Sequence, residues 1–422
     1  MRAQNATSVL KFFSFVFVII FSGCQSNSIK NNTEQSEGKL SEKVPAQSIE
    51  IDPRKFENKE LSLADFAGDI KYIPLSNKLQ IGSVQVLRLT ANAVYIIYNS
   101  SGGGEGNGHP QLFRFDKNGK NPVEIGSVGR GPREYLSGNY FAVDEPGNRI
   151  YISGKINTVL VFDTLGNYVR QFKFQNTDQR FAQLEYLDKN KLFVPAQKRG
   201  AGGPYLWSII DTFGNTVSSK PNTTPPFETR LGPRSGTFIF QDKISYWVDY
   251  NDTIFQIAPD FSYRASYIIT PGEHKVIHQD LPFSPDLPEK LLEFYSPHVF
   301  WETNKYLISR YNFKGKFAYV FIDKNTHNTS VSSFEWERGK RGGIPNNFDG
   351  GMDFSPETCF TDNGKEYLAG YIQPYELKIY VASDEFKMTT PKFPEKKKEL
   401  ERLANTLDEN DNPILMLVKL KK

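Results

Sequence analysis

Apolar and polar residues alternate along this chain in segments that recur at a fixed spacing. The segments QLFRFDKNGK, VLVFDTLGNY and LWSIIDTFGN each combine an alternating apolar run with an aspartate and a glycine-containing turn. This pattern predicts a β-hairpin. The aspartates of these three segments are 47 and 48 residues apart, and the same position recurs further along the chain. The five equivalent positions are Asp116, Asp163, Asp211, Ala258 and Asp323.

A second β-rich segment precedes most of these hairpins, as in NRIYIS, NKLFVP, DKISYWV and NKYLIS. A repeat of about 47 residues with four strand signals is the periodicity of a β-propeller blade. The sequence therefore predicts five blades and the start of a sixth. The expected blades span 83–126, 139–174, 181–220, 236–270 and 297–335, and the sixth begins near residue 355.

Two further strand signals, DIKYIPLS at 69–76 and NPILMLVKLK at 412–421, have no blade of their own. Pairing them would complete the sixth blade and remove an exposed sheet edge. The segment 394–407, which begins at Pro394, has the composition of a helix inside the last blade. We therefore predict an all-β fold, a six-bladed β-propeller closed by its terminal strands and carrying a short helical insertion.

The first residues have the layout of a secretory signal. Arg2 and Lys11 supply positive charge, and 12–21 is an apolar stretch too short to span a bilayer permanently. The sequence FSGC is similar to a bacterial lipobox, which implies cleavage before Cys24 and lipidation of its thiol. The polar residues that follow predict a disordered tether. The expected organisation is a signal peptide at 1–23, a tether at 24–60 and the propeller at 61–422.

Charge and cysteine content narrow the function further. The net charge is +3, and it falls to +1 once the signal peptide is removed, which argues against nucleic-acid binding. Cys359 is the only cysteine besides Cys24, so lipidation would leave no intramolecular disulfide and no CxxC metal motif. The expected location is the bacterial cell envelope, on the membrane through the lipid and facing the periplasm rather than the cell surface. Nothing in the sequence specifies an oligomeric state.

Several segments together indicate a family. FAGDIKYIPLS, GSVGRGPREYLSG, FAVDEPGNRIYIS, VLVFDTLGNYVRQF and NTLDENDNPILMLVKL resemble the six-bladed β-propeller lipoproteins of Bacteroidota, which are related in architecture to NHL-repeat proteins. The resemblance covers roughly residues 60–422. It implies a cell-envelope propeller that binds carbohydrate, peptide or a partner protein. It supplies no set of catalytic residues.

The long loops of the repeat should gather at one mouth of the propeller channel, and we expect a ligand there because binding residues concentrate on loops. Gly-Pro-Arg occurs in two of these loops, so the arginines either clamp a carboxylate or phosphate or order their own loops. Nearby tyrosines either stack on a ligand or pack in the core. The candidate binding residues are Arg130, Arg133, Tyr135, Arg234, Tyr311 and Tyr371.

Two other chemistries were considered. The glycine-rich GSVGRGPREYLSG lacks the following helix and the GK[ST] of a phosphate-binding loop, so nucleotide binding is not expected. The alternative function is a metal-dependent hydrolase or lyase of the lactonase type, in which Asn139, His298 and Asp353 would surround Ca²⁺ or Zn²⁺ in the channel. The preferred interpretation is a binding protein with no catalytic residue, no resident metal and no cofactor.

Overall fold

The computed structural model describes the greater part of the chain. The chain divides into two units, Met1–Glu34 and Gln35–Lys422, and all of the described residues belong to the second. The described residues are 36–37, 45–56, 60–99, 110–136, 138, 140–154, 157–174, 183–195, 203–225, 234–276, 287–335 and 342–421.

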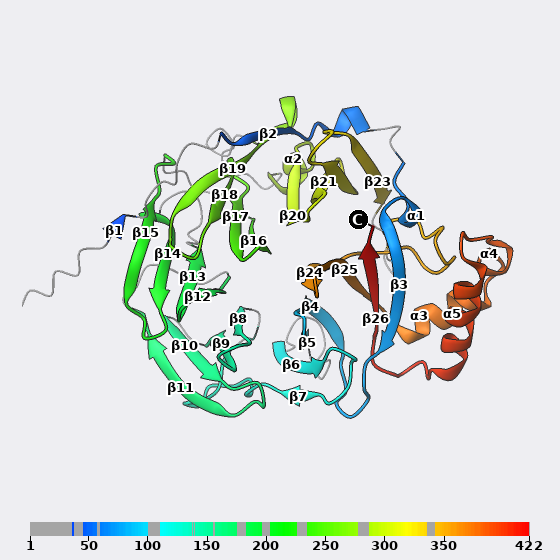
Figure 1. Cartoon of the computed structure of the whole chain (residues 1–422), viewed down its shortest axis with the longest axis horizontal. Helices are drawn as coiled ribbons and strands as arrows, with labels where there is room; N and C mark the ends of the chain where they lie inside the picture. Colours follow the sequence, from blue (N-terminus) through cyan, green and yellow to red (C-terminus); the bar gives the residue numbers. More distant parts are fainter. Residues whose placement is uncertain are drawn as a thin grey trace, which may run out of the picture. The chain divides into compact units, whose positions relative to one another are not determined.

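Six antiparallel sheets surround a central axis, which Figure 1 views end on. The first five sheets are each built on a meander of four consecutive strands, and the sixth combines β24, β25 and β26 with β3 from the start of the propeller chain. In each sheet the first of these strands lies nearest the axis and the fourth lies at the perimeter. We number the sheets one to six by the innermost strands β4, β8, β12, β16, β20 and β24. The predicted six-bladed propeller and its blade boundaries are therefore confirmed.

The strands of the first three sheets are β4 (Ser83–Leu89), β5 (Ala93–Asn99), β6 (Pro110–Asp116), β7 (Val123–Glu124), β8 (Phe141–Asp144), β9 (Arg149–Ser153), β10 (Thr158–Phe162), β11 (Tyr168–Lys173), β12 (Glu185–Asp188), β13 (Lys191–Pro195), β14 (Tyr205–Asp211) and β15 (Thr216–Pro221). Those of the last three sheets are β16 (Ser235–Phe240), β17 (Lys243–Val248), β18 (Asn251–Ile257), β19 (Tyr263–Thr270), β20 (Ser296–Glu302), β21 (Tyr306–Phe313), β22 (Lys316–Asp323), β23 (Thr329–Glu335), β24 (Thr358–Asp362), β25 (Lys365–Ile372), β26 (Ile414–Leu420) and β3 (Ala67–Pro74).

The aspartates of the sequence repeat form the turns between third and fourth strands. Asp163 Oδ1 accepts hydrogen bonds from the backbone N–H groups of Leu165 and Asn167, at 3.0 and 2.8 Å. Partial burial alone would raise the pKa of Asp163, but the hydrogen bonds from Asn167 and Leu165 outweigh it, and the pKa lies below its usual value. Asp116 and Asp211 make the same turn contacts. The repeat therefore specifies turn geometry.

Apolar side chains from neighbouring sheets fill the spaces between them. Phe193 of the third sheet lies within 5.9 Å, between ring centroids, of both Trp207 and Tyr246, the latter from the fourth sheet. Such aromatic pairs add about 0.5–1.5 kcal/mol each to the burial of their area. This packing joins one sheet to the next and explains the high phenylalanine content. Within the described residues, no helix combines the length and apolar character needed to cross a membrane.

The two ends of the propeller chain meet in the sixth sheet. Strand β26 pairs in antiparallel register with β3, from Ile414 opposite Pro74 to Leu420 opposite Ala67. Strands β24 and β25 complete this sheet. Because β3 comes from the start of the propeller and β26 from its end, the pairing closes the ring and leaves β26 without a free edge. The predicted closure by terminal strands is confirmed.

Residues 45–56 and 60–66, which we call the belt, run along the perimeter. Strand β2 (Gln47–Glu50) adds to the fourth sheet by pairing in parallel with β19. A 3₁₀ turn η1 (Pro53–Phe56) follows, Glu60 bridges to Val331 of the fifth sheet, and the one-turn helix α1 (Leu63–Phe66) leads into β3. A two-residue strand β1 (Ser36–Glu37) pairs in parallel with β15 of the third sheet.

The prediction of a disordered tether over 24–60 is wrong for residues 45–56. Ile49, Ile51 and Phe56 are all buried against the propeller. These few apolar residues cannot form a core of their own, which is why the local pattern resembles a disordered segment. The completed perimeter of the fourth and fifth sheets supplies the apolar surface that they need. Residues 24–35 and 38–44 lie outside the described part of the chain.

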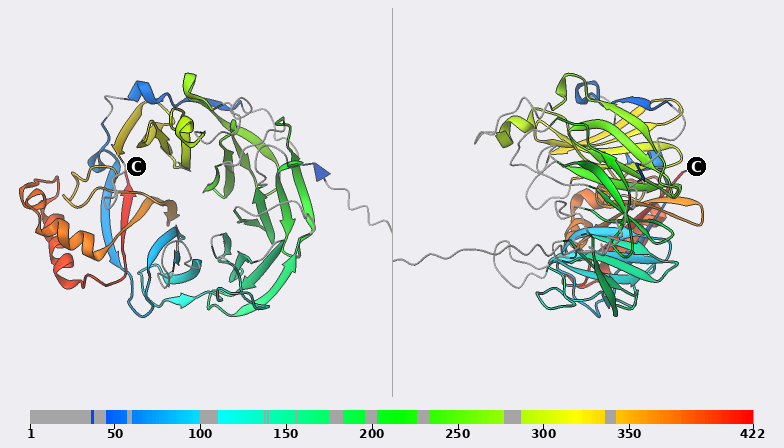
Figure 2. Two further views of the ribbon diagram at one scale, coloured as in Figure 1. Left: turned by 180° about the vertical axis from the view of Figure 1, so that it is seen from behind. Right: turned by 90° about the vertical axis from the view of Figure 1, so that its left-hand side faces the viewer.

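The helical insertion is larger than the sequence pattern predicts. The predicted helix at 394–407 is present as α5 (Pro394–Thr406), and α3 (Pro374–Ala382) and α4 (Asp384–Met388) precede it. The side chain of Glu376 accepts a hydrogen bond from the backbone N–H of Gln373 at 3.2 Å and so caps α3. The three helices lie outside β3, at the edge of the ring (Figure 1, and the left view of Figure 2). The remaining helices are η2 (Gly272–His274) and α2 (Leu287–Leu292).

Candidate functional site

The two ends of the propeller axis carry different connections. At one end, which we call the short-turn end, tight turns link first to second and third to fourth strands. The other end, which we call the long-connection end, carries the links between second and third strands and between successive sheets. The predicted separation of short and long loops is therefore present. Segments 100–109, 196–202, 226–233, 277–286 and 336–341 of the long connections lie outside the described residues.

A cavity of about 550 Å³, which we call the bowl, lies on the axis toward the short-turn end. Gln241, Asp242 and Gly364 of the tight turns line it, which places it at this end. The loop lengths predict a site at the long-connection end, whereas the bowl lies at the opposite mouth. All six innermost strands contribute to it, through Arg88 (β4), Val143 (β8), Glu185 (β12), Thr237 (β16), Trp301 (β20) and Thr358 (β24).

A buried ion pair closes the inner part of the bowl. Both Nη atoms of Arg88, on the first sheet, contact the carboxylate of Glu185, on the third, at 2.9 and 2.6 Å. Thr237 Oγ1 of the fourth sheet donates to the same carboxylate at 2.7 Å. The Glu185 side chain is only 3% exposed, whereas Arg88 is 31% exposed. The bidentate pair and the Thr237 hydrogen bond together link the first, third and fourth sheets.

Four carboxylates line the bowl, and two of them are paired with cations. Glu185 pairs with Arg88, and Glu302 Oε1 accepts from Lys324 Nζ at 2.9 Å and from Tyr267 Oη at 2.8 Å. The other two are Asp242 and Glu366. Within the described residues neither of these contacts a cationic side chain, although Glu366 accepts the backbone N–H of Asn304 at 2.7 Å. The bowl is therefore negatively charged overall.

The rest of the bowl combines hydroxyl and amide groups with an apolar wall. The polar lining residues are Thr90, Thr237, Thr358, Thr361, Gln241 and Asn304. Ile239, Phe240 and Phe360 supply the apolar part, and Ile239 is 53% exposed. A cavity of several hundred Å³ with an apolar wall and a few polar groups is typical of a small-ligand site. The bowl can offer hydrogen bonds and apolar contact to one molecule.

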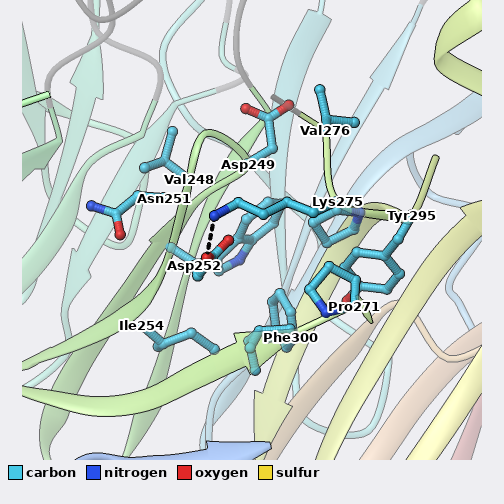
Figure 3. A pocket seen from close by; sticks show the side chains of 13 residues that line it. Val248, Asp249, Asn251, Asp252, Ile254, Pro271, Lys275, Val276, Tyr295 and Phe300 are labelled. Carbon is cyan, nitrogen blue, oxygen red and sulfur yellow. Dashed lines mark hydrogen bonds and ion pairs between the residues drawn. The ribbon is translucent and has the colours of Figure 1, made fainter. Parts of the chain in front are cut away.

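A smaller pocket lies between the fourth and fifth sheets at the long-connection end (Figure 3). Its volume is about 40 Å³, which is room for little more than one water molecule. Trp247, Tyr295 and Phe300 form its apolar side. Lys275 Nζ contacts Asp252 Oδ2 at 2.5 Å beside it, as the dashed line in Figure 3 marks. The pocket is too small for a ligand of the predicted kind.

Asp249, on the edge of this small pocket, gives a prediction about pH. Burial raises the pKa of Asp249 to about 6, above the value of about 3.9 in an unfolded chain. The folded protein then holds a proton that the unfolded chain has lost, so this contribution to stability is present at pH 4 and disappears as the pH rises through 6.

We therefore expect Asp249→Asn to raise the free energy of unfolding at pH 7.5 by about 1–2 kcal/mol and to leave it unchanged at pH 4. Urea unfolding at the two pH values measures this. Asp242→Asn, a change at an exposed turn carboxylate, is the control and should have little effect at either pH. An equal gain at both pH values would contradict the prediction.

The structure places the candidate tyrosines in the core. Tyr135 Oη donates to the carbonyl of Ile125 at 2.8 Å and accepts from Gln111 Nε2 at 2.7 Å. Tyr311 is buried and its ring lies 5.1 Å from that of Tyr295. Tyr371 Oη donates to the carbonyl of Val84 at 3.2 Å, which joins the sixth sheet to the first. Of the two roles considered for these residues, the described contacts are those of packing.

The glycine-rich connector GSVGRGPREYLSG links the first and second sheets. Gly126 has a φ of +61°, and a Cβ there would lie 2.5 Å from the ring of Phe162. The backbone N–H of Gly131 donates to Glu134 Oε2 at 2.6 Å. The glycines therefore allow a sharp turn and close packing around Tyr135.

The candidate arginines occupy unlike positions. Arg133 lies over the ring of Tyr168 on the outermost strand β11, 5.1 Å from its centroid. Arg234 instead directly precedes the innermost strand of the fourth sheet and contacts Ser296 and His298 on the innermost strand of the fifth. The two Gly-Pro-Arg motifs therefore do not form one clamp. Arg130 is exposed, and Cys24 lies outside the described residues.

The residues of the metal alternative do not form a group in the described structure. Asn139 lies outside the described residues. His298 Nε2 is 3.0 Å from Arg234 Nη1, and Asp353 is exposed. Across the described ranges, no three or more histidine, cysteine, aspartate or glutamate side chains are arranged to hold a metal ion.

Sequence reasoning missed the residues that line the bowl. Arg88, Glu185 and Glu302 are charged residues within or at the ends of otherwise apolar innermost strands. A charge in such a strand is a signal, because the strand is buried and a buried charge requires a partner. Which charges pair cannot be found from spacing, since Arg88 and Glu185 are 97 residues apart.

Comparison with solved structures finds proteins of similar fold. A protein from Bacteroides fragilis described as a "putative exported protein" matches with a TM-score of 0.64 and 14% identity, over 90% of this chain and 100% of that one. A member of the DUF4221 family from Bacteroides vulgatus matches with a TM-score of 0.47 and 11% identity, over 84% and 97% of the two chains. At these identities the likeness shows the fold alone.

A PQQ-bound aldose sugar dehydrogenase from Streptomyces coelicolor matches with a TM-score of 0.37 and 10% identity, over 83% of this chain and 98% of that one. No curated protein matches the chain. A family model described as "Domain of unknown function (DUF4934)" matches residues 46–419, from the belt to the closing strand β26. Because this match covers most of the chain, the protein belongs to the DUF4934 family.

Proposed function

We propose that the protein is a lipid-anchored protein of the bacterial cell envelope that binds a polar ligand, a glycan or a peptide, in the bowl. The observation that carries this proposal is the cavity of about 550 Å³ lined by all six innermost strands. Its inner part is held by the Arg88–Glu185 pair, so its walls are rigid before a ligand arrives.

The lining favours a ligand that donates many hydrogen bonds. Threonine hydroxyls and the amides of Gln241 and Asn304 are placed next to carboxylates of Asp242 and Glu366. Ile239 and Phe360 offer an apolar surface on which a sugar ring or a peptide side chain can rest. The same charges disfavour an anionic ligand in the bowl.

Two observations support the proposed location in the cell envelope. The first residues combine a short apolar stretch with the FSGC sequence, which is similar to a lipobox. The likeness in fold to a "putative exported protein" agrees with export. Strand β1 joins the third sheet at Ser36, so the segment between a lipid on Cys24 and the folded body is about 12 residues and spans about 40 Å at most.

The test is binding of the full-length protein to an array of defined glycans and peptides, followed by calorimetry on the strongest binder. Ile239→Trp and Thr361→Trp should fill the bowl, and we expect each to weaken binding at least about tenfold, a loss of about 1.4 kcal/mol. Leu165→Trp, at an exposed position on a turn outside the bowl, is the matched control. A binder whose affinity survives both bowl variants would contradict the proposal.

A further inference from the structure

A second cluster of charged side chains lies at the long-connection end, outside the bowl. Arg310 on β21 is 22% exposed, and its nearest described acceptors are distant. Arg310 Nη1 is 3.5 Å from Tyr319 Oη and 3.6 Å from Glu357 Oε2, both at or beyond the limit of a hydrogen bond. Arg310 Nε is buried and has no hydrogen-bond partner among the described residues. A mostly buried guanidinium is therefore left with unused donors.

Arg234 supplies a second guanidinium nearby. Its Nη1 contacts Ser296 Oγ and lies 3.0 Å from His298 Nε2, both of which are neutral acceptors. Within the described residues no carboxylate contacts this guanidinium directly; Asp249 Oδ2 instead accepts the backbone N–H of Arg234 at 3.1 Å. Arg234 is exposed at the mouth of the channel. Its charge is available to a ligand from solvent.

His298 is close to both arginines. Its Nε2 contacts Arg234, and the next residue, Val299, is the register partner of Arg310 between β20 and β21. Burial, followed by the charges of Arg234 and Arg310, lowers the pKa of His298 to about 3, so the ring is neutral at physiological pH. Because Nε2 accepts from Arg234, the hydrogen of the neutral ring is on Nδ1. The ring packs 5.3 Å from that of Phe317, which fixes its orientation. A neutral His298 therefore supplies no negative charge to offset the two guanidinium groups.

These residues come from neighbouring sheets around one mouth of the channel. Arg234 directly precedes β16, and Glu357 directly precedes β24. Ser296 and His298 lie in the first three residues of β20, and Arg310 is near the end of β21. Asp249 and Glu357 are the acidic residues beside the two arginines, and among the described residues Arg310 Nε has no acceptor. A buried donor without an acceptor costs about 1–3 kcal/mol, more when it is charged. A bound oxyanion would remove that cost.

We propose that Arg234, Arg310 and His298 form a binding site for an oxyanion group, the carboxylate, sulfate or phosphate of a ligand at the long-connection end. Planar guanidinium groups match the two oxygens of such a group in a bidentate contact. This site is separate from the bowl. It favours an anionic ligand, whereas the carboxylates that line the bowl disfavour one. The propeller would then hold two ligands of different charge at its two mouths.

The experiment measures, by calorimetry and thermal unfolding, which oxyanions bind the full-length protein. The probes are sodium sulfate, inorganic phosphate, D-glucuronate and a peptide that has a free carboxyl terminus but no acidic side chain. Sodium chloride at equal ionic strength, D-glucose and the same peptide with an amidated terminus are the neutral comparisons. We expect at least one oxyanion to raise the unfolding temperature above its comparison. The probe that binds most tightly identifies the source of the group.

Three variants locate the site. Arg234→Met and Arg310→Met should each weaken oxyanion binding about tenfold or more. Arg310 is mostly buried, so Arg310→Lys, which keeps the charge and loses the bidentate fork, provides a second variant if Arg310→Met does not fold. Arg133→Met is the matched control and should bind like the parent protein. Ile239→Trp should also leave oxyanion binding unchanged, which separates this site from the bowl.

Two results would overturn the proposal. The first is that no oxyanion binds more tightly than its comparison in the parent protein. The second is that binding persists in Arg234→Met and in the Arg310 variants, or is lost equally in Arg133→Met. Either result would leave the proposed ligand of the bowl untouched, because that ligand is tested with different variants.

Discussion

Replacing Glu185 by alanine is expected to lower the free energy of unfolding by about 3–5 kcal/mol, the usual cost of removing one member of a buried ion pair. Glu185 is 3% exposed and accepts both Nη atoms of Arg88 and the hydroxyl of Thr237. Without the carboxylate, the Arg88 guanidinium keeps one hydrogen-bond acceptor among the described residues, the carbonyl oxygen of Phe141 at 3.4 Å. Urea unfolding followed by circular dichroism measures the loss.

Two further variants show whether the loss comes from the unpaired charge. Asp242→Asn removes the charge of a bowl carboxylate that contacts no described cation. Because Asn also tolerates the φ of +59° at this position, we expect a change within about 0.5 kcal/mol. Replacing Arg88 and Glu185 together by methionine should recover much of the stability, since an apolar pair of similar volume carries no desolvation cost. A double variant as unstable as Glu185→Ala would show that shape, and not charge, is the cause.

Removing the first 75 residues is expected to prevent folding. The shortened chain lacks β3, so β26 becomes an unpaired outer strand, and it also lacks the belt. Buried side chains lost with these segments include Ile51, Leu63, Phe66 and Ile70, each worth about 1.5–3 kcal/mol when fully buried. Their sum is comparable to the whole stability of a typical domain. Far-UV circular dichroism and size-exclusion chromatography would show loss of structure or aggregation through the open edge.

A version of the protein that begins at residue 45 is the matched control, because it keeps both β2 and β3. We expect it to unfold cooperatively and at a temperature close to that of the full-length protein. If the version beginning at residue 76 unfolds at the same temperature as this control, ring closure by β3 is not what holds the sixth sheet together.

The fold could be predicted largely because its signals are local and repeated. The turn aspartates Asp116, Asp163 and Asp211 hold their own backbone, so their pattern does not depend on distant residues. The strand signals at 69–76 and 412–421 lacked partners, and in a ring of sheets they had only each other. The belt was not predicted, because Ile49 and Ile51 are buried only against a surface that other parts of the chain form.

The candidate site was harder to predict than the fold. The loop lengths predict that one end of the propeller carries the long loops, and Arg133, Arg234 and the nearby tyrosines are the candidate binding residues on those loops. Tyr135 and Tyr311 are buried in the core. The sequence does not reveal this burial, because it depends on the direction in which each side chain points. The bowl lies at the end with the shorter turns, and its residues come from six strands spread over the length of the chain.

The sequence by itself determined the number of blades, the turn chemistry and the closure of the ring, because each of these rests on residues close in sequence or on a repeat. Only the tertiary structure decided which charged and polar side chains meet: Arg88 of the first sheet with Glu185 of the third, and Arg234 of the fourth with His298 of the fifth. The physical reason is that an ion pair or a cavity is a property of distances in space. In a ring of sheets, residues about one hundred positions apart become neighbours.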